Sequence, residues 1–488
     1  MTDNNSDDRT YLQESIKELH RQGSLHPADS DMLMDSVSSK GHSQKRLSPS
    51  EQSSLSGEPA ETPVQRSLTG EGENRKAGGQ KVIIPMAITF ALGLLVASLI
   101  FRMVYKPSEG INESTATSAE KELSKQTIAP DDTVEIPDPV LKKAIQDTLG
   151  IGDREITKSE ALSMTKLEYN AYAKNRFIKD ITGLSAFKNL TKLILSHNDI
   201  SDISALSGLT KLKTLRLQGN EISDVSALAG LTNLTLLDLR YNDVSEIHFL
   251  SGLTNLMRLY LSSNQISDIN ALSGLTKLTR LNLGRNQVSD INALSGLTNL
   301  TILYLYNNQV SDISALSGLT NLTELDLHES QVSDIDALSD LTNLTILLLY
   351  GNQISDINAL SGLTKLYDLR LENNQINDIN ALSDLTNLEL LFLDNNQISN
   401  INALSNLTNL DMLLLGNNQI SDINALSGLT KLYDLRLENN QINDINALSD
   451  LTNLNLLFLD GNPVLENKSR GEIMEVLSGA ENLREIDF

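Results

Sequence analysis

A unit of 22 residues recurs along the C-terminal part of the chain, with the consensus LTNLTxLxLxxNQISDINALSG. Its clearest marker is an asparagine that returns at every 22nd position or a multiple of it: Asn198, Asn220, Asn242, Asn264, Asn286, Asn308, Asn352, Asn374, Asn396, Asn418, Asn440 and Asn462. Ser330 takes the one missing place, so thirteen units follow one another without an insertion. Such a short, strict period predicts a solenoid in which each unit packs only on its neighbours.

Within each unit, two kinds of hydrophobic spacing follow one another. The pair Leu193 and Leu195 is typical of a short strand, because alternate residues of a strand point to the same face. After the asparagine, residues such as Ile354, Ile357 and Leu360 are spaced to point inward from a short helical turn. We therefore expect an α/β solenoid, with a parallel sheet on one side and helical turns on the other. Since 40% of the residues are hydrophobic but only 4% are aromatic, its core is predicted to be aliphatic.

The marker asparagine is predicted to turn the chain and to satisfy backbone groups that the bend leaves unpaired. Stacked copies can also bond to the neighbouring turns and form a ladder along the solenoid. Ser330 has a shorter side chain without an amide, so we expect a local weak point there. The aspartates that recur after the turn, such as Asp356, are interpreted as caps of the helical turns rather than as calcium ligands.

The two ends of the solenoid need caps that shield the outer units from solvent. A helix is predicted to begin after Asp138 and Pro139 and to end at Gly150. Thr157 and Glu160 have the spacing of a capping box at the start of a second helix. At the other end, one helix and one last strand are predicted from the residues Ile473, Val476, Leu477, Leu483 and Ile486.

The sequence before the solenoid divides into three segments. Residues 1–81 are polar, without a sustained apolar period, and are predicted to be a disordered tail. Residues 82–105 are predicted to form a transmembrane helix, because residues 82–101 carry no charge and are about long enough to cross a membrane of ~30 Å. Residues 106–133 are interpreted as a linker. The remaining predicted parts are an N-terminal cap with an atypical first repeat at 134–184, the repeats at 185–464 and a C-terminal cap at 465–488.

The basic residues on both sides of the span indicate its orientation. Four precede it and three follow it: Arg66, Arg75, Lys76, Lys81, Arg102, Lys106 and Lys121. Because cytoplasmic flanks carry more Lys and Arg, this bias favours a single-pass protein with a cytoplasmic N-terminus and extracytoplasmic repeats.

The repeats resemble the 22-residue leucine-rich repeats of the internalin family of bacterial surface proteins. Residues 136–167 resemble the helical N-terminal cap of that family, and the resemblance covers about residues 134–488. It implies a curved leucine-rich-repeat solenoid whose concave sheet binds a partner protein, often one on a host cell. The repeats are also similar to those of the leucine-rich-repeat regulatory subunit of type-one protein phosphatase. That similarity leaves an alternative open, in which the chain is a membrane-tethered intracellular scaffold or phosphatase regulator.

Residues that alternate with the strand leucines point out of the sheet, so the core does not fix their identity. The candidate protein-binding residues on the concave face are Tyr260, Tyr304, Tyr306, His328, Leu348, Tyr350, Arg370, Phe392, Leu414 and Phe458. Exposed aromatic and leucine side chains on a sheet indicate an interaction surface. The alternative is that they only stack across neighbouring strands and stabilise the sheet. Charged neighbours such as Asp238, Arg240 and Arg436 are expected to form a rim or to pair between strands.

Other classes of function find little support in the sequence. The repeat region holds only His197, His248 and His328, on different units, and no phosphate-binding loop or nucleophile elbow. We therefore predict a protein that is not an enzyme and has no cofactor, metal site or catalytic residues. A net charge of −24 argues against binding nucleic acid. The predicted partners are a protein ligand and, through residues 82–105, a membrane, and the solenoid is expected to be monomeric.

Residues 353–394 recur at 419–460 with a single difference, Glu389 against Asn455. The copy is displaced by three whole units. The duplicated units are therefore predicted to serve either as a spacer or as a second, identical binding face.

Overall fold

The computed structural model describes residues 132–169, 171, 176–480 and 483–487. The predicted tail at 1–81, the predicted transmembrane helix at 82–105 and the predicted linker up to residue 131 lie outside these residues. Among the helices that are described, none combines the length and the apolar character needed to cross a membrane.

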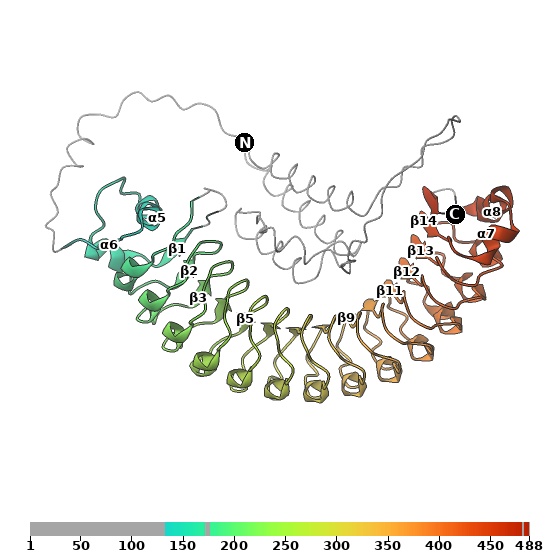
Figure 1. Cartoon of the computed structure of the whole chain (residues 1–488), viewed down its shortest axis with the longest axis horizontal. Helices are drawn as coiled ribbons and strands as arrows, with labels where there is room; N and C mark the ends of the chain where they lie inside the picture. Colours follow the sequence, from blue (N-terminus) through green and yellow to red (C-terminus); the bar gives the residue numbers. More distant parts are fainter. Residues whose placement is uncertain (1–131, 170, 172–175, 481–482, 488) are drawn as a thin grey trace, which may run out of the picture. The chain divides into compact units, whose positions relative to one another are not determined.

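The described residues form one parallel sheet of fifteen strands, in which each strand pairs with the next one in sequence. Every strand has three residues, and equivalent residues of successive units are in register, as Leu303 is with Leu325. In Figure 1 the strands line the inner side of the arc that the repeats follow. The strands are β1 (Lys166–Glu168), β2 (Lys192–Ile194), β3 (Thr214–Arg216), β4 (Leu236–Asp238), β5 (Arg258–Tyr260), β6 (Arg280–Asn282), β7 (Ile302–Tyr304), β8 (Glu324–Asp326), β9 (Ile346–Leu348), β10 (Asp368–Arg370), β11 (Leu390–Phe392), β12 (Met412–Leu414), β13 (Asp434–Arg436), β14 (Leu456–Phe458) and β15 (Glu485–Asp487).

The outer, convex side of the arc carries one short 3-10 helix per unit (Figure 1). These are η2 (Thr182–Ala186), η3 (Ser204–Leu206), η4 (Ser226–Leu228), η5 (His248–Gly252), η6 (Asn270–Leu272), η7 (Asn292–Leu294), η8 (Ser314–Leu316), η9 (Asp336–Leu338), η10 (Asn358–Leu360), η11 (Asn380–Leu382), η12 (Asn402–Asn406), η13 (Asn424–Leu426), η14 (Asn446–Leu448) and, in the C-terminal cap, η15 (Leu477–Gly479). The recurring aspartate accepts a hydrogen bond at the start of most of them, as Asp356 Oδ1 does from the N–H of Asn358 at 2.9 Å. Its interpretation as a cap is confirmed.

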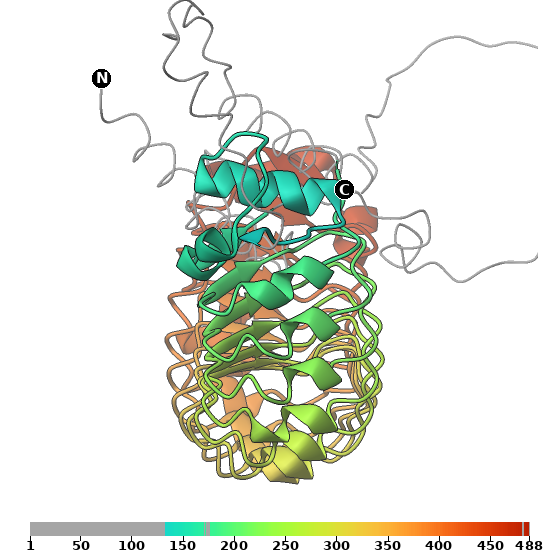
Figure 2. The same ribbon diagram turned by 90° about the vertical axis from the view of Figure 1, so that its left-hand side faces the viewer.

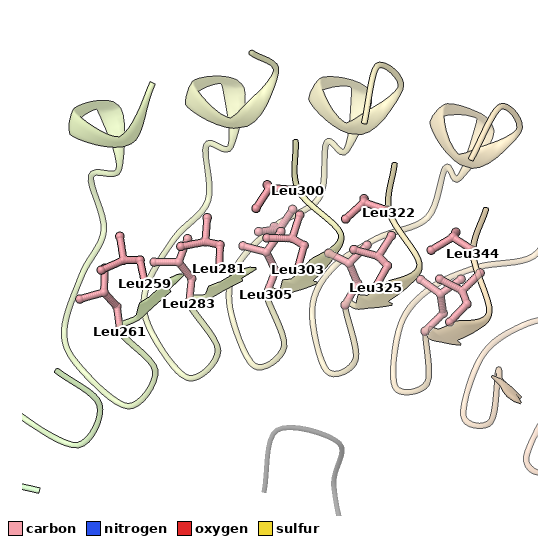
Figure 3. Close-up of a cluster of buried hydrophobic side chains, with 14 of the residues drawn as sticks. Leu259, Leu261, Leu281, Leu283, Leu300, Leu303, Leu305, Leu322, Leu325 and Leu344 are labelled. Carbon is pink, nitrogen blue, oxygen red and sulfur yellow. The ribbon is translucent and has the colours of Figure 1, made fainter. Parts of the chain in front are cut away.

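An aliphatic core runs between the sheet and the 3-10 helices through all units. Figure 3 shows its middle part, where strand leucines such as Leu303 and Leu305 face Leu300 and Leu322. These side chains are fully buried. The leucines that define the repeat therefore form one continuous core, as the period predicts.

Two helices cap the N-terminal end, which faces the viewer in Figure 2. Helix α5 (Pro139–Leu149) begins at Asp138, whose carboxylate accepts hydrogen bonds from two backbone N–H groups, and ends at Gly150 in a left-handed conformation. Helix α6 (Lys158–Ser163) begins with the capping box of Thr157 and Glu160. Both predictions are confirmed. The second oxygen of Asp138 also accepts a hydrogen bond from the backbone of Lys179 at 2.9 Å, which ties the cap to the first units.

The C-terminal end has two short helices and the last strand. Helix α7 (Pro463–Asn467) was not expected from the sequence, whereas α8 (Arg470–Val476) occupies the predicted helical segment. Ser469 and Glu472 form a second capping box at the start of α8. Strand β15 pairs with β14 and ends the sheet, as predicted.

The marker asparagines form the predicted ladder. Asn308 is representative: its amide nitrogen donates to the carbonyl oxygens of Leu305 in its own unit and Leu283 in the preceding one, at 2.9 and 3.0 Å. Its amide oxygen accepts from the N–H of Val288 at 2.9 Å. Ser330 lacks these bonds, because its buried Oγ has no hydrogen-bond partner. The predicted weak point in the ladder is confirmed at this position.

The turn itself depends on the residue before the asparagine. That residue has a positive φ in all thirteen units. Glycine or asparagine, which tolerate this conformation best, occupies eight of the places, as Gly351 and Asn307 do. Glu329 holds it with φ 48° in the unit that also lacks the ladder asparagine.

Candidate binding surface on the concave face

The concave surface consists of three columns of outward side chains, one residue from each unit in each column. Their residues stand six, four and two positions before the marker asparagine of the unit, or before Ser330 in the unit that lacks it. We call them the first, second and third columns. In the unit of β7 they are Ile302, Tyr304 and Tyr306, which alternate with the buried Leu303 and Leu305. Parallel register places each column across neighbouring strands, so a residue and its equivalent 22 positions later lie side by side.

Three rings of the third column form a stack. The ring of His328 lies between those of Tyr306 and Tyr350, with centroids 4.8 and 4.2 Å apart and nearly parallel planes. His328 Nδ1 lies 2.7 Å from Asp326 Oδ1, so the last residue of β8 holds the imidazole ring in place. Beside the stack, the hydroxyl of Tyr304 donates to Glu324 Oε1 at 2.7 Å. Aromatic rings from the units of β7, β8 and β9 therefore form one ordered patch.

Three arginines of the concave face share one arrangement. Arg370 lies 3.0 Å from Asp368 on its own strand, and its guanidinium lies over the ring of Phe392 on the next strand, 4.6 Å from the centroid. Arg436 pairs in the same way with Asp434 and lies over the ring of Phe458. Arg240 pairs with Asp238 and lies over the ring of Tyr260. The expected pairing between strands is therefore wrong for these charges. Each pairs with the aspartate two positions earlier in the chain, because residues two apart in an extended backbone point to the same face of the sheet.

The structure also corrects the expected exposure of the candidate residues. Seven of the ten are buried, and the other three are half-buried: Tyr350, Leu414 and Phe458. The stacking alternative therefore describes much of what these side chains do. Burial raises the pKa of the Tyr350 hydroxyl, and the nearby Asp326 raises it further, so this tyrosine stays neutral.

Two tyrosines that sequence reasoning missed are more accessible than any of the ten candidates. Tyr367 is 37% exposed and Tyr433 is 44% exposed, and each precedes the first residue of a strand. They are equivalent residues of the duplicated units. Most other units have threonine at this place, so a bulky residue in a threonine column was the available signal. The partial burial of its ring raises the pKa of Tyr367 to about 12, and the neighbouring Asp368 adds to the effect.

The surface combines aromatic, cationic and anionic groups. Aromatic rings, paired guanidiniums and carboxylates occupy a broad sheet face. Within the described ranges, no three His, Cys, Asp or Glu side chains converge in a way that could hold a metal ion.

Comparison with known proteins agrees with this geometry. The family model described as Leucine Rich repeats (2 copies) matches residues 188–230, 232–272, 254–296, 298–340, 342–384, 386–428 and 408–449. No curated protein sequence matches the chain.

Among solved structures, an internalin of Listeria monocytogenes is 35% identical with a TM-score of 0.62, over 72% of this chain and 96% of the internalin. A leucine-rich-repeat protein of Leptospira interrogans is 27% identical with a TM-score of 0.62, over 68% of this chain and 85% of its own. The plant peptide hormone receptor RGFR1, solved in complex with RGF2, shares the fold at 24% identity and a TM-score of 0.54, over 61% of this chain and 51% of the receptor.

Proposed function

Because the chain belongs to the leucine-rich-repeat family and is a protein of the internalin type, we propose that it binds a protein ligand through its concave face. The observation that carries the proposal is the ordered aromatic patch of β7 to β9, on a sheet face whose outward residues the core does not dictate. Tyrosines provide large contact areas at low cost in side-chain entropy. The matching family is a repeat module rather than an enzyme family.

The accessible part of this surface is where a ligand makes first contact. Tyr350 is half-buried, and Tyr367 and Tyr433 keep more than a third of their surface exposed. Tyr350 belongs to the third column, whereas Tyr367 and Tyr433 stand at the entrance of their strands. Together they extend the candidate surface from β9 to β13.

The proposal can be tested with a variant that keeps the buried part of the patch. In the full chain, Tyr350, Tyr367 and Tyr433 are changed to serine, and proteins are captured from candidate membranes and secretions. A matched control changes Leu162 and Met474, two exposed apolar residues of the caps, to serine. We expect a partner that the wild type and the control capture and the tyrosine variant loses. Equal capture by all three chains contradicts a ligand site on the concave face.

We further propose that residues 82–101 anchor the protein in a membrane, with the repeats on the extracytoplasmic side. The support is the uncharged run itself and the excess of basic residues before it. Protease added to intact cells is expected to remove the repeats and to leave the N-terminal tail protected. If the protease digests the repeats only after the cells are lysed, the result favours the intracellular scaffold instead.

A further inference from the structure

The C-terminal half of the concave face is acidic. The outward positions of β10 to β14 and the residues that follow these strands hold six carboxylates and two guanidiniums: Asp368, Glu372, Asp394, Asp434, Glu438, Asp460, Arg370 and Arg436. Both arginines are held by the aspartate of their own strand. The four carboxylates that remain stand in the third column, and we call them the acidic column: Glu372, Asp394, Glu438 and Asp460.

Gly416 stands in the middle of the acidic column. Its backbone N–H donates to Asp394 Oδ1 at 2.8 Å. A Cβ atom at this glycine would lie 3.0 Å from Asp394 Oδ1 and 2.6 Å from the carboxyl carbon of Glu438. Two carboxylates from different units therefore converge above a residue that has no side chain.

Two oxygens of the acidic column lack donors. Glu372 Oε2 and Glu438 Oε2 are buried and accept no hydrogen bond. Buried acceptors of this kind are uncommon in proteins, and each calls for an explanation. Burial raises the pKa of Glu372 to about 8 and that of Asp394 to about 7, in agreement with carboxylates that have lost water without gaining enough donors. Glu438 shifts in the same direction, also through burial.

A cationic donor would satisfy both unpaired oxygens. In the described part of the chain, these side chains do not form a metal-binding cluster of three or more ligands. An ammonium or guanidinium group carries both the charge and the N–H donors that the unpaired oxygens lack. Leu414 and Phe458, half-buried in the adjacent second column, offer apolar surface for the aliphatic part of a lysine or arginine.

The spacing of the two glutamates defines the form of such a ligand. Glu372 and Glu438 are equivalent residues of the duplicated units, three strands apart in the sheet. With about 4.8 Å between neighbouring strands, they are roughly 14 Å apart along the solenoid. An extended chain rises about 3.4 Å per residue, so its residues i and i+4 span the same distance and point to the same side.

We propose that the acidic column binds an extended basic segment of a protein ligand, with lysine or arginine at i and i+4 paired to Glu372 and Glu438. This inference rests on the proposed function, because it names the partner chemistry of the same concave face. The duplication then produces a second copy of one cation site, and both sites act on a single ligand chain.

The test uses the full chain in mild detergent and fluorescent nine-residue peptides of glycine and serine. One peptide has lysines at i and i+4, the second has lysines at i and i+3, and the third has glutamates at i and i+4. Binding is measured by fluorescence anisotropy at pH 9, above the pKa of Glu372, at low and high salt. We expect the i and i+4 lysine peptide to bind best, with an affinity that falls as salt rises. No binding of this peptide, or equal binding of the glutamate peptide, overturns the proposal.

The matching protein variant is Glu372→Gln with Glu438→Gln, which keeps shape and removes charge. We expect its affinity for the i and i+4 lysine peptide to fall about tenfold or more, as when a partly buried charge loses its partner. The control is Asp356→Asn with Asp422→Asn, which removes two charges with the same spacing on the convex side. Asparagine already serves as the cap there at Asn400, so the control keeps its fold. Equal loss in both variants contradicts a site at the acidic column.

Failure of this inference is distinguishable from failure of the proposed function. If the lysine peptides do not bind, while partner capture still depends on Tyr350, Tyr367 and Tyr433, only the basic-segment ligand is wrong. The peptide series on the wild-type chain gives an answer even if the double glutamine variant does not fold.

Discussion

At the scale of single residues, the repeat is held by a polar position rather than by its leucines alone. The ladder asparagine satisfies groups in its own unit and in the preceding one, and it does so from a buried place. Serine is also polar, but its side chain is shorter and has no amide group. It does not replace the asparagine, because the Oγ of Ser330 has no hydrogen-bond partner.

Ser330→Asn is therefore expected to stabilise the solenoid by about 1 kcal/mol, because the ladder regains hydrogen bonds and a buried group gains partners. Urea unfolding followed by circular dichroism measures the change. Asn308→Ser is the reciprocal variant and is expected to lower stability by a similar or larger amount. An unchanged or lower midpoint for Ser330→Asn contradicts the ladder as a source of stability.

The buried carboxylate of Glu372 predicts a pH dependence of stability. Its pKa is raised from 4.5 to about 8 by burial, against the opposing charge of Arg370 and with the added repulsion of Asp394. The folded state therefore binds the proton more tightly than the unfolded chain, and stability falls as the pH rises from about 4.5 through about 8. Glu372→Gln is expected to be about 1 to 3 kcal/mol more stable than the wild type at pH 9 and similar to it at pH 5. Lower stability of the variant at pH 9 contradicts this assignment.

At the level of helices and strands, the two caps depend on polar contacts between residues close in sequence, so their residues can be recognised in the sequence. Asp138, Pro139 and Gly150 mark the ends of α5, and Thr157 with Glu160 marks the start of α6. These signals are local, so they could be predicted residue by residue. Glu160 has a further partner, Arg154, that the sequence analysis did not identify.

Arg154 and Thr157 lower the pKa of Glu160 from 4.5 to about 2, mainly through the hydrogen bond from Arg154. The folded state thus holds the carboxylate charged, and the stabilisation is complete above pH 4.5 and lost as the pH falls through about 2. Glu160→Gln is expected to weaken α6 by about 1 kcal/mol at pH 7, the usual value of a capping interaction. Faster amide hydrogen exchange in residues 158–163 at pH 7 measures this. Unchanged exchange contradicts a stabilising role for the capping box.

In the whole molecule, the 22-residue period determines the sheet, the core and the ladder. The burial and the pairing of surface side chains depend instead on residues of neighbouring units. The parallel sheet, the inner strands, the aliphatic core and the ladder could be predicted, because one unit contains all the information that they need. The burial of Tyr304 or Leu348 could not, since it depends on the size and pairing of residues in other units. For the same reason the pairing of Arg370 with Asp368 and the accessibility of Tyr367 appear only in the structure.

The modular architecture predicts that whole units can be removed. Deleting residues 353–418 joins Asn352 to Gln419, which has the same place in its unit as Gln353. The shortened chain is expected to fold cooperatively with a moderately lower urea midpoint, because only nearest-neighbour contacts are lost. Deleting residues 353–407 removes two and a half units, which breaks the 22-residue register, and is the control expected to disrupt the stack. Equal behaviour of the two chains contradicts register-dependent packing.

Site-specific photo-crosslinking distinguishes a ligand that contacts the concave face from one that contacts the convex face. A photoreactive phenylalanine analogue is placed at Tyr350 on the concave face or at the exposed Ser339, which directly follows η9 on the convex face. Both chains are irradiated with the extracts used for partner capture. We expect one crosslinked protein from position 350 and none from position 339. A partner that crosslinks from position 339 and not from position 350 would contradict recognition by the concave face.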